Sequence, residues 1–161
     1  MRNAAIWLPA LLAALVREWQ VDFELVAIDD GSTDGSAEVL KKLCSHWPVE
    51  RWTLLSGEGR GVSAARNLGL AQSQAEIVAF IDADDRPLPG RLGLPLGVLE
   101  NNSELSHVHG GLWRCDANGQ YRHPVRPWQE GAAFSWRSFM EHKAILPSAW
   151  TVRRNALMAV E

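Results

Sequence analysis

The chain of 161 residues contains little cysteine and no excess of basic charge. Its two thiols, Cys44 and Cys115, cannot form a disulfide framework or a four-thiolate zinc site, so we expect a reducing, cytoplasmic location. Lysine and arginine number 16 against 19 aspartates and glutamates, which gives a net charge of -3. Because no dominant basic field is available to hold phosphates, we expect no nucleic-acid partner.

Long hydrophobic runs are also absent. The longest, residues 4–16, is interrupted by Pro9 and is too short to cross a bilayer. A signal peptide could use such a run, but no small-residue cleavage site follows it. The pattern favours a helix with Asn3 as its N-cap and an apolar face toward a core. That face would consist of Leu8, Leu11, Leu12 and Leu15.

The composition is typical of one globular domain, with 47% hydrophobic and 22% charged residues. Apolar runs that predict strands alternate with helical patterns through the first 100 residues. We predict strands at 23–28, 51–55 and 76–81, and helices from Asp34 or Ser36 to before Pro48 and over 62–73. This alternation predicts an α/β fold with a mostly parallel, helix-covered sheet. Right-handed crossovers would bring the loops after the three strands to one edge, where such sheets bind ligands.

Beyond residue 100 the pattern becomes mixed. Residues 105–115 alternate loosely, Asn118-Gly119 is a strong hairpin signal, and residues 135–142 have a helical pattern. We therefore predict a smaller mixed segment after the α/β part.

Acidic residues gather in two short windows that each follow a predicted strand. Six of the eight aspartates lie there, namely Asp29, Asp30, Asp34, Asp82, Asp84 and Asp85. Asp82-Ala83-Asp84 can bind a hard divalent cation and, through it, a diphosphate. A solvated acidic turn is the alternative. Haloacid-dehalogenase phosphatases also place Asp-x-Asp after a strand, but with Thr or Val two residues beyond, where this chain has Arg86.

The first acidic window offers acceptors for a nucleoside. Asp29 and Asp30 can accept hydrogen bonds from ribose hydroxyls or a base imide, and Gly31 permits a close approach. Helix capping explains Asp34 and Ser36 but leaves the first two carboxylates without a role.

The glycines at 57, 59 and 61 form a turn between the second strand and the next helix. They lack both the GxGxxG spacing and the Walker lysine and serine, so they are a weak cofactor signal. Arg66 would lean toward the N-terminus of its helix and reach the ligand edge, with a surface salt bridge as the alternative.

Histidine, cysteine and tryptophan give weaker signals. His107 and His109 would share one strand face with Cys115 further along, which makes a metal site conceivable. Three tryptophans could stack on a sugar or simply pack, and we assign them no role. They are Trp113, Trp136 and Trp150.

Three ordered blocks, residues 25–36, 61–69 and 78–85, resemble the inverting, metal-dependent glycosyltransferases of the GT-A fold in the family-2 group. The resemblance covers residues 2 to about 92 and returns at 147–157, where Arg153-Arg154 is similar to the family's double-Arg segment. It implies a nucleotide-sugar-binding α/β core over 1–100 and a partial acceptor-side segment over 101–161.

The resemblance also implies roles for individual residues. Asp30 would contact the base with Arg66 near the same end, and Asp82 would meet the ribose or the metal. Asp84 would be the principal ligand of Mn²⁺ or Mg²⁺. The full nucleotide-contacting set would be Asp29, Asp30, Ser32, Arg66 and Asp82.

The resemblance implies a nucleotide-diphosphate sugar as donor, with UDP the commonest carrier, and a glycan or lipid-linked acceptor with peripheral membrane association. Two family features are missing: a buried strand ending in Pro-x-x-Asn, of which Asn3 remains, and a catalytic base, expected beyond Glu161. We therefore expect a chain truncated at both ends and inactive alone. A non-catalytic nucleotide-sugar-binding or assembly module is the alternative.

Overall fold

The computed structural model of the chain describes residues 1–18, 20–46, 51–116, 119–125 and 146–159, and the structural statements below concern these residues. The predictions for Asn118, Trp136, the helix at 135–142 and Glu161 lie outside them.

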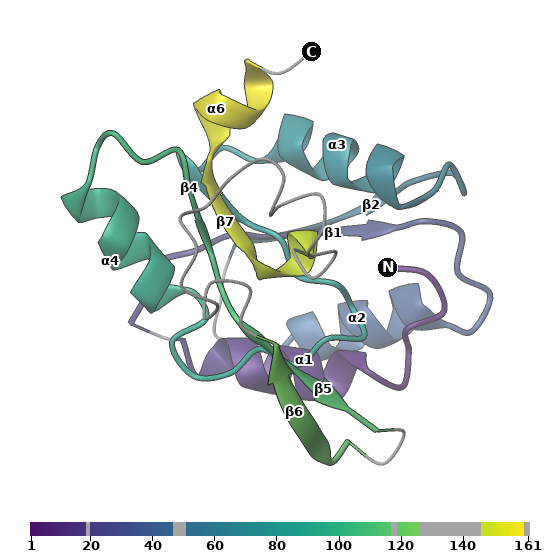
Figure 1. The fold of residues 1–161 in the computed structure, drawn as a ribbon. Helices are drawn as coiled ribbons and strands as arrows, with labels where there is room; N and C mark the ends of the chain where they lie inside the picture. The colour runs from purple at the N-terminus through teal and green to yellow at the C-terminus, as the bar shows by residue number, and fades with distance from the viewer. Residues whose placement is uncertain (19, 47–50, 117–118, 126–145, 160–161) are drawn as a thin grey trace.

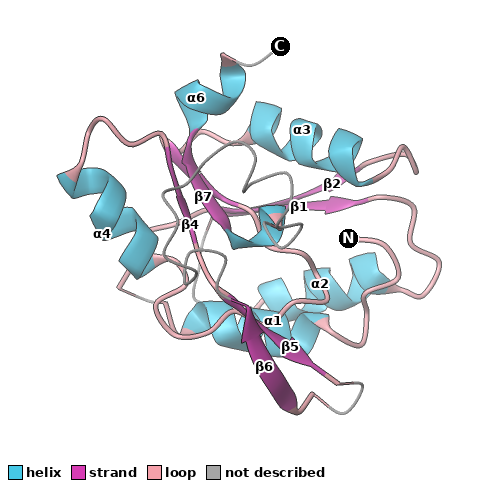
Figure 2. Ribbon diagram, viewed as in Figure 1, coloured by secondary structure: helices cyan, strands magenta, loops and turns pink. Residues whose placement is uncertain are grey.

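Three small sheets lie between helices (Figures 1 and 2). Strands β1 and β2 pair in parallel, from Leu25↔Trp52 to Asp29↔Ser56. Strand β7 pairs antiparallel with β3 on one side and with β4 on the other. Strands β5 and β6 form the antiparallel hairpin that the sequence predicts. The strands are β1 Leu25–Asp29, β2 Trp52–Ser56, β3 Ile77–Ala79, β4 His107–His109, β5 Leu112–Cys115, β6 Tyr121–Val125 and β7 Trp150–Arg153.

The helices cover both faces of the β1–β2 pair: α1 and α2 lie on one side of it and α3 on the other (Figure 1). The predicted strands and helices of the first 80 residues are present with ends shifted by a few residues. Among the described residues, no helix has the length and apolar character needed to cross a membrane. The helices are α1 Leu8–Val16, α2 Ser36–Cys44, α3 Val62–Gln72, α4 Gly93–Asn101, α6 Arg154–Met158 and the 3-10 turn η1 Pro147–Ala149.

The core forms where the leucine face of α1 meets α2 and the sheets. Leu8, Leu11, Leu12 and Leu15 are buried as predicted, in one cluster with Leu40 of α2. Partly buried side chains of β1, β2 and β3 pack against the same cluster. Helix α1 therefore contacts both the β1–β2 pair and the sheet that contains β3.

The prediction that Asn3 caps α1 is wrong. The helix begins at Leu8 after Trp7, whereas Asn3 has a φ of 53° and lies one turn earlier. Its side-chain oxygen accepts a hydrogen bond from the Thr33 backbone N–H at 2.8 Å. Asparagine often caps helices, but Asn3 instead anchors the N-terminal segment to the loop after β1. The two bonded residues are thirty positions apart in the sequence.

Asp34 and Ser36 serve two segments at once. The Asp34 carboxylate accepts from the backbone N–H of Ser36, the first residue of α2, and from that of Ala5. The Ser36 hydroxyl accepts from the backbone N–H of Ala4 at 2.8 Å. The predicted capping of α2 by Asp34 or Ser36 is wrong, because the N-cap residue is Gly35 and it makes no side-chain capping bond. The Asp34 and Ser36 side chains instead satisfy N–H groups at the first residue of α2 and ahead of α1.

Glu18 joins the end of α1 to the start of α4. It is 7% exposed, and its carboxylate accepts from the backbone N–H groups of Gly90, Leu92 and Gly93 at 2.6, 3.1 and 3.2 Å. A buried carboxylate at a helix N-terminus satisfies donors that have no partner inside the helix. This contact spans more than seventy residues of sequence.

We expect Glu18→Ala to lower the free energy of unfolding by about 3 kcal/mol, because it leaves three N–H groups, one buried and two partly buried, without their acceptor. Chemical denaturation followed by circular dichroism measures the change. Glu104→Ala, which removes an exposed carboxylate, is the control and should change stability by less than about 0.5 kcal/mol. Equal effects of the two substitutions would contradict the capping role of Glu18.

Candidate functional site

The loops after β1 and β2 meet at Asp30. This residue is 5% exposed, and its Oδ2 accepts a hydrogen bond from the Gly61 backbone N–H at 2.8 Å. Its other oxygen, Oδ1, is buried and has no hydrogen-bond partner among the described residues. A buried carboxylate oxygen without a donor is costly, so this atom is suited to accept a hydrogen bond from a ligand.

Glycines let the backbone pass close to Asp30. Gly61 has a φ of 92°, a conformation that L side chains rarely adopt, and this orientation directs its N–H at the carboxylate. A Cβ on Gly57 would lie 2.7 Å from Oδ1 of Asp30 and 3.1 Å from Ile28. Of the glycines at 57, 59 and 61, Gly57 thus makes room for Asp30 and Gly61 donates its N–H to it.

Asp29 and Ser32 bond to each other in this structure. The Asp29 carboxylate accepts from the Ser32 backbone N–H at 3.1 Å and from its hydroxyl at 2.5 Å. The Ser32 hydroxyl also accepts from the Asn3 backbone N–H at 3.0 Å. These two predicted ligand residues close the loop after β1, and a contact of either with a nucleotide stays a prediction.

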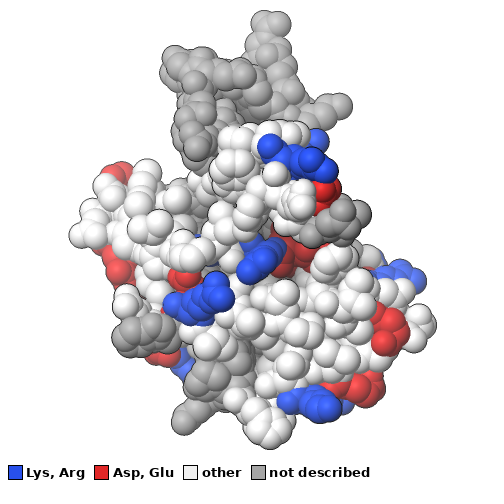
Figure 3. All heavy atoms as spheres, turned by 90° about the horizontal axis from the view of Figure 1, so that it is seen from below, with Lys and Arg blue, Asp and Glu red and all other residues white. Residues whose placement is uncertain are grey.

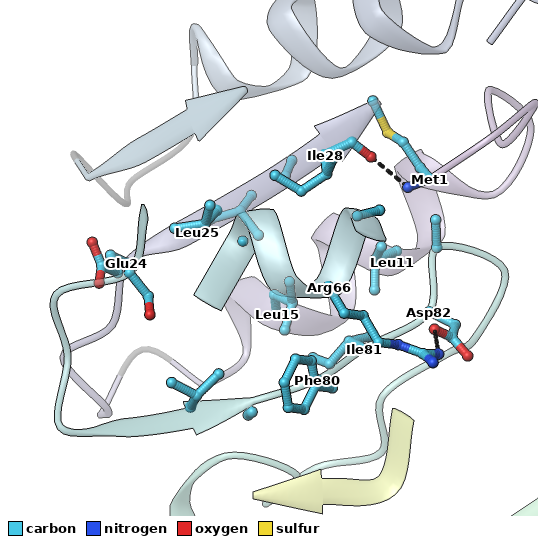
Figure 4. A pocket seen from close by; sticks show the side chains of 18 of the residues that line it. Met1, Leu11, Leu15, Glu24, Leu25, Ile28, Arg66, Phe80, Ile81 and Asp82 are labelled. Atoms are coloured by element: carbon cyan, nitrogen blue, oxygen red, sulfur yellow. Dashed lines mark hydrogen bonds and ion pairs between the residues drawn. The ribbon is translucent and has the colours of Figure 1, made fainter. Parts of the chain in front are cut away.

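Arg66 reaches the loop after β3. Its side chain extends from the first half of α3 to Asp82, and its Nη2 donates to Asp82 Oδ1 at 2.8 Å (Figure 4). A contact of Arg66 with a nucleotide stays a prediction. The exposed fractions of the two side chains are 25% and 39%, so solvent screens this pair only in part. The ion pair links Arg66 directly to the acidic turn rather than to Asp30.

The carboxylates of both acidic windows act on a single amine, that of Met1. Desolvation lowers the pKa of this amine, and the charges of Asp29, Asp30, Asp82 and Asp84 oppose that shift. Asp30, Asp82 and Asp84 line the same cavity as Met1. The loops after β1 and β3 thus lie at one cavity, although the two strands belong to separate sheets.

The Asp82–Asp85 turn supplies oxygen donors for a cation. Asp84 is exposed, and the turn is closed by the Asp85 backbone N–H, which donates to the Asp82 carbonyl at 3.0 Å. Desolvation raises the pKa of Asp85, with a hydrogen bond from Ser148 opposing it and the charges of Asp82 and Asp84 adding to it. In the part of the chain that the structure describes, no three metal-ligating side chains form a cluster, including at His107, His109 and Cys115.

Two carboxylates on one turn fit a magnesium-like cation better than a zinc-like one. Mg²⁺ is bound in many sites by one or two carboxylates, with substrate phosphates and water completing its shell. Asp82 and Asp84 offer that number of hard oxygen donors at the edge where the loops converge. The donor set therefore fits a divalent cation that arrives with a diphosphate.

Arg91 holds the end of the segment that leads into the acidic turn, and the sequence did not predict this role. Its guanidinium donates to the carbonyls of Phe80, Ser148 and Trp150 at 3.1, 3.0 and 2.9 Å and to the Thr151 hydroxyl at 2.8 Å. It thereby ties the end of β3, just before Asp82, to β7. A lone arginine after a proline-rich turn has no local pattern that signals this role.

Charge on the surface is mixed. On the face shown in Figure 3, acidic and basic side chains lie near one another instead of forming separate fields. That arrangement gives this face no broad surface of one sign with which to attract a polyanion.

Comparisons with known proteins identify a family and a fold. The family model described as Glycosyl transferase family 2 matches residues 1–157. The uncharacterized glycosyltransferase YibD of Escherichia coli is 31% identical over 119 residues, which is 73% of this chain and 32% of that protein. An uncharacterized glycosyltransferase of Haemophilus influenzae is 32% identical over 118 residues, 73% of this chain and 46% of that protein. The chain thus spans less than half the length of these relatives.

Solved structures share the fold. The crystal structure of Staphylococcus aureus TarS 1-349 matches with a TM-score of 0.71 at 22% identity, over 99% of this chain and 46% of that one. The mannosyltransferase PcManGT from Pyrobaculum calidifontis, solved with GDP-Man and Mn²⁺, matches with a TM-score of 0.55 at 26% identity, over 66% and 32% of the two chains. These matches confirm the α/β, GT-A-like class predicted from the sequence.

We expect Gly57→Ala to destabilise the protein by about 1 to 3 kcal/mol, because the added methyl group would press on Asp30 and Ile28. Thermal unfolding measures this effect. Gly97→Ala is the matched control, since a Cβ there meets no atom within 4 Å and the residue lies inside α4. It should leave stability unchanged or raise it. If both variants melt at the parent temperature, the packing around Asp30 is looser than described.

Proposed function

Because the chain belongs to glycosyl transferase family 2, we propose that it forms the donor-binding part of an enzyme that transfers a sugar from a nucleotide-diphosphate carrier to an acceptor hydroxyl. The observation that carries this proposal is that Asp30 and the Asp82–Asp84 turn line one cavity. Asp30 has a buried carboxylate oxygen with no hydrogen-bond partner among the described residues, and the Asp82–Asp84 turn has two carboxylates that can bind a hard cation.

The nucleoside lies at Asp30 in this proposal. Its buried Oδ1 lacks a donor, and the imide N–H of uracil would supply one. We therefore choose a UDP-sugar as the donor. Asp29 and Ser32, next to Asp30 on the same loop, are within the segment that would contact the ribose.

The diphosphate lies at the Asp82–Asp84 turn. Mn²⁺ or Mg²⁺ held by Asp84, with Asp82 beside it, would offset the negative charge of the departing nucleoside diphosphate. The complex of PcManGT with GDP-Man and Mn²⁺ supports a metal for a chain of this family. Arg66 orients Asp82 through their ion pair and adds positive charge to the same edge.

Transfer itself requires attack by a hydroxyl of a glycan or lipid-linked acceptor on the anomeric carbon, opposite the departing diphosphate, which inverts that carbon. The hydroxyl proton goes to a general base, a role that we assign to no described residue. A lipid-linked acceptor would bring the enzyme to a membrane surface as a peripheral protein.

The first test is metal-dependent binding. We expect UDP to bind in the presence of Mn²⁺ and to bind at least tenfold more weakly in EDTA or in Asp84→Asn, because the diphosphate would lose its bridge to the protein. Isothermal titration calorimetry measures the affinity. Glu104→Gln, an exposed acid outside the site, is the control and should bind as the parent does.

Equal affinity with and without chelator would remove the metal from the proposal. Metal-dependent binding of UDP-sugars with no transfer to any glycan or lipid acceptor by the complete protein would favour the alternative of a nucleotide-sugar-binding module.

The second test concerns the base. In Asp30→Asn a side-chain amide can face the base, so we expect UDP to bind about tenfold more weakly and the preference to shift toward CDP, whose ring nitrogen accepts a hydrogen bond. The metal requirement should not change. Competition titrations with UDP and CDP measure the preference, after circular dichroism has shown the parent fold. A variant that weakens both nucleotides equally would place the base elsewhere.

A further inference from the structure

Two exposed aromatic side chains are in contact on the β5–β6 hairpin, away from the groups used in the proposed function. Trp113 and Tyr121 have exposed fractions of 43% and 53%. Their ring centroids are 5.8 Å apart with an angle of 60° between the ring planes, which is an edge-to-face arrangement. Single apolar side chains on a surface are ordinary, but here two large aromatic ones share one small area. The pair is therefore a candidate binding surface.

The two rings lie on one face of the hairpin together with Cys115. Trp113 and Cys115 are two positions apart on β5, and Cys115 is paired with Tyr121 of β6. Cys115 is also exposed. Because side chains alternate between the two faces of a strand, Arg114 lies on the opposite face. The face that bears Trp113, Cys115 and Tyr121 is called the aromatic face below.

Polar contacts near the end of the hairpin hold the aromatic face in shape. The Asp116 backbone N–H donates to the Gln120 carbonyl at 3.0 Å, and the Asp116 carboxylate accepts from the Gln120 N–H at 2.9 Å. The same carboxylate forms an ion pair with Arg122. A two-stranded hairpin alone is marginally stable in water, so these contacts help to keep the rings in place. Rings that are already positioned lose less conformational entropy when a ligand binds.

The hairpin is too small for a typical protein partner. It projects from the molecule at the end opposite α6 (Figure 1). Strand β6 has five residues, and its ladder with β5 is a two-stranded sheet. At about 3.4 Å per residue and about 10 Å across two strands, one face measures about 170 Å². A stable protein interface covers about 800 Å² of each partner, so the aromatic face fits a chain-like or small ligand better.

The chemistry of the aromatic face suits a carbohydrate. The face of an aromatic ring carries partial negative charge, which attracts the C–H groups on the flat side of a pyranose ring. Since the two ring planes are inclined at 60°, neighbouring sugar units that are tilted relative to each other can each contact one ring. Gln120 and Arg122 flank Tyr121 in the sequence, are exposed, and offer N–H donors to sugar hydroxyls.

The base of the hairpin is connected to the acidic turn. Gly110, between β4 and β5, donates its N–H to the Ala149 carbonyl at 2.9 Å. The preceding residue, Ser148, is hydrogen-bonded to Asp85. Trp113 is three residues beyond Gly110, which is at most about 10 Å of extended strand. A chain of several sugar units with one end at the acidic turn can therefore reach the aromatic face.

We propose that the aromatic face binds pyranose units of a glycan by stacking on Trp113 and Tyr121. These units would lie several positions away from the sugar that carries the reacting hydroxyl. The assignment of this glycan as the acceptor rests on the proposed function, whereas its binding to the hairpin requires neither nucleotide nor metal.

The experiment measures how a soluble glycan protects Cys115 from alkylation. The 161-residue protein is treated with iodoacetamide in EDTA, with and without cellohexaose, and the modified cysteines are identified by mass spectrometry. We expect cellohexaose at twice its dissociation constant to slow alkylation of Cys115 by about threefold, because alkylation requires the free form. Cys44 is buried and provides an internal reference in the same sample.

Substitutions on the two faces of the hairpin separate stacking from a general effect. We expect Trp113→Ala and Tyr121→Ala each to abolish the protection by cellohexaose, and Trp113→Phe to retain part of it because a ring remains. Arg114→Ala is the matched control on the opposite face and should be protected as the parent is. The alkylation rate without sugar shows for each variant whether the hairpin still exposes Cys115 to the same extent.

Protection that depends on both rings and survives Arg114→Ala supports the proposal. No protection by cellohexaose overturns it, and so does protection that persists in Trp113→Ala. Protection by UDP with Mn²⁺ instead of cellohexaose would assign the rings to the nucleotide. A Cys115 that resists iodoacetamide without any sugar would show that a protein segment or a second copy covers the face, which also overturns it. Because EDTA is present throughout, failure of metal-dependent UDP binding is a separate result.

Discussion

The hydrogen bond between the Gly61 N–H and the Asp30 carboxylate holds the first two post-strand loops together, and the rest of the site depends on it. It forms in a buried place where an unpaired carboxylate oxygen is costly, so the loops stay close. With Asp30 fixed, α3 begins directly beyond Gly61 and brings Arg66 within reach of Asp82. One buried carboxylate thereby determines where the next loop and the acidic turn lie.

The strands form separate sheets, and a second set of polar contacts connects the segments around them. Strands β1 and β3 share no ladder, yet the two sheets keep a fixed relation because α1 packs against both. Glu18 connects the end of α1 to the start of α4, and Arg91 connects the end of β3 to β7. Glu18 is buried and Arg91 is partly buried, and both are hydrogen-bonded to backbone groups, which is the condition under which charge is tolerated away from water.

In the proposed function, Asp30 and Asp84 have different roles because they differ in burial. Asp30 is buried and has an acceptor left over, as suits the recognition of a planar base with a fixed N–H. Asp84 is exposed at the mouth of the same edge, where a hydrated cation and a diphosphate can enter. The difference in burial thus distinguishes Asp30 from Asp84, which composition alone cannot do.

Local signals in the sequence predicted strands β1 to β3, helices α1 to α3, the leucine face of α1, the β5–β6 hairpin and both acidic windows, whereas β7 and α4 were not predicted. Apolar periodicity, glycine-rich turns and carboxylates next to strand ends all act over a few residues, so they can be recognised without a structure. The three ordered blocks in residues 25–85 also indicated the family. The number of cysteines argued against a disulfide framework and a four-thiolate zinc site, and the net charge argued against nucleic-acid binding.

Tertiary structure decided what depends on distant partners. Asn3 holds the loop at Thr33 instead of capping α1, β3 pairs antiparallel with β7 from seventy residues away, and Arg91 reaches three carbonyls that no sequence pattern relates to it. A side chain chooses among nearby donors and acceptors, and only the folded chain establishes which of them are near.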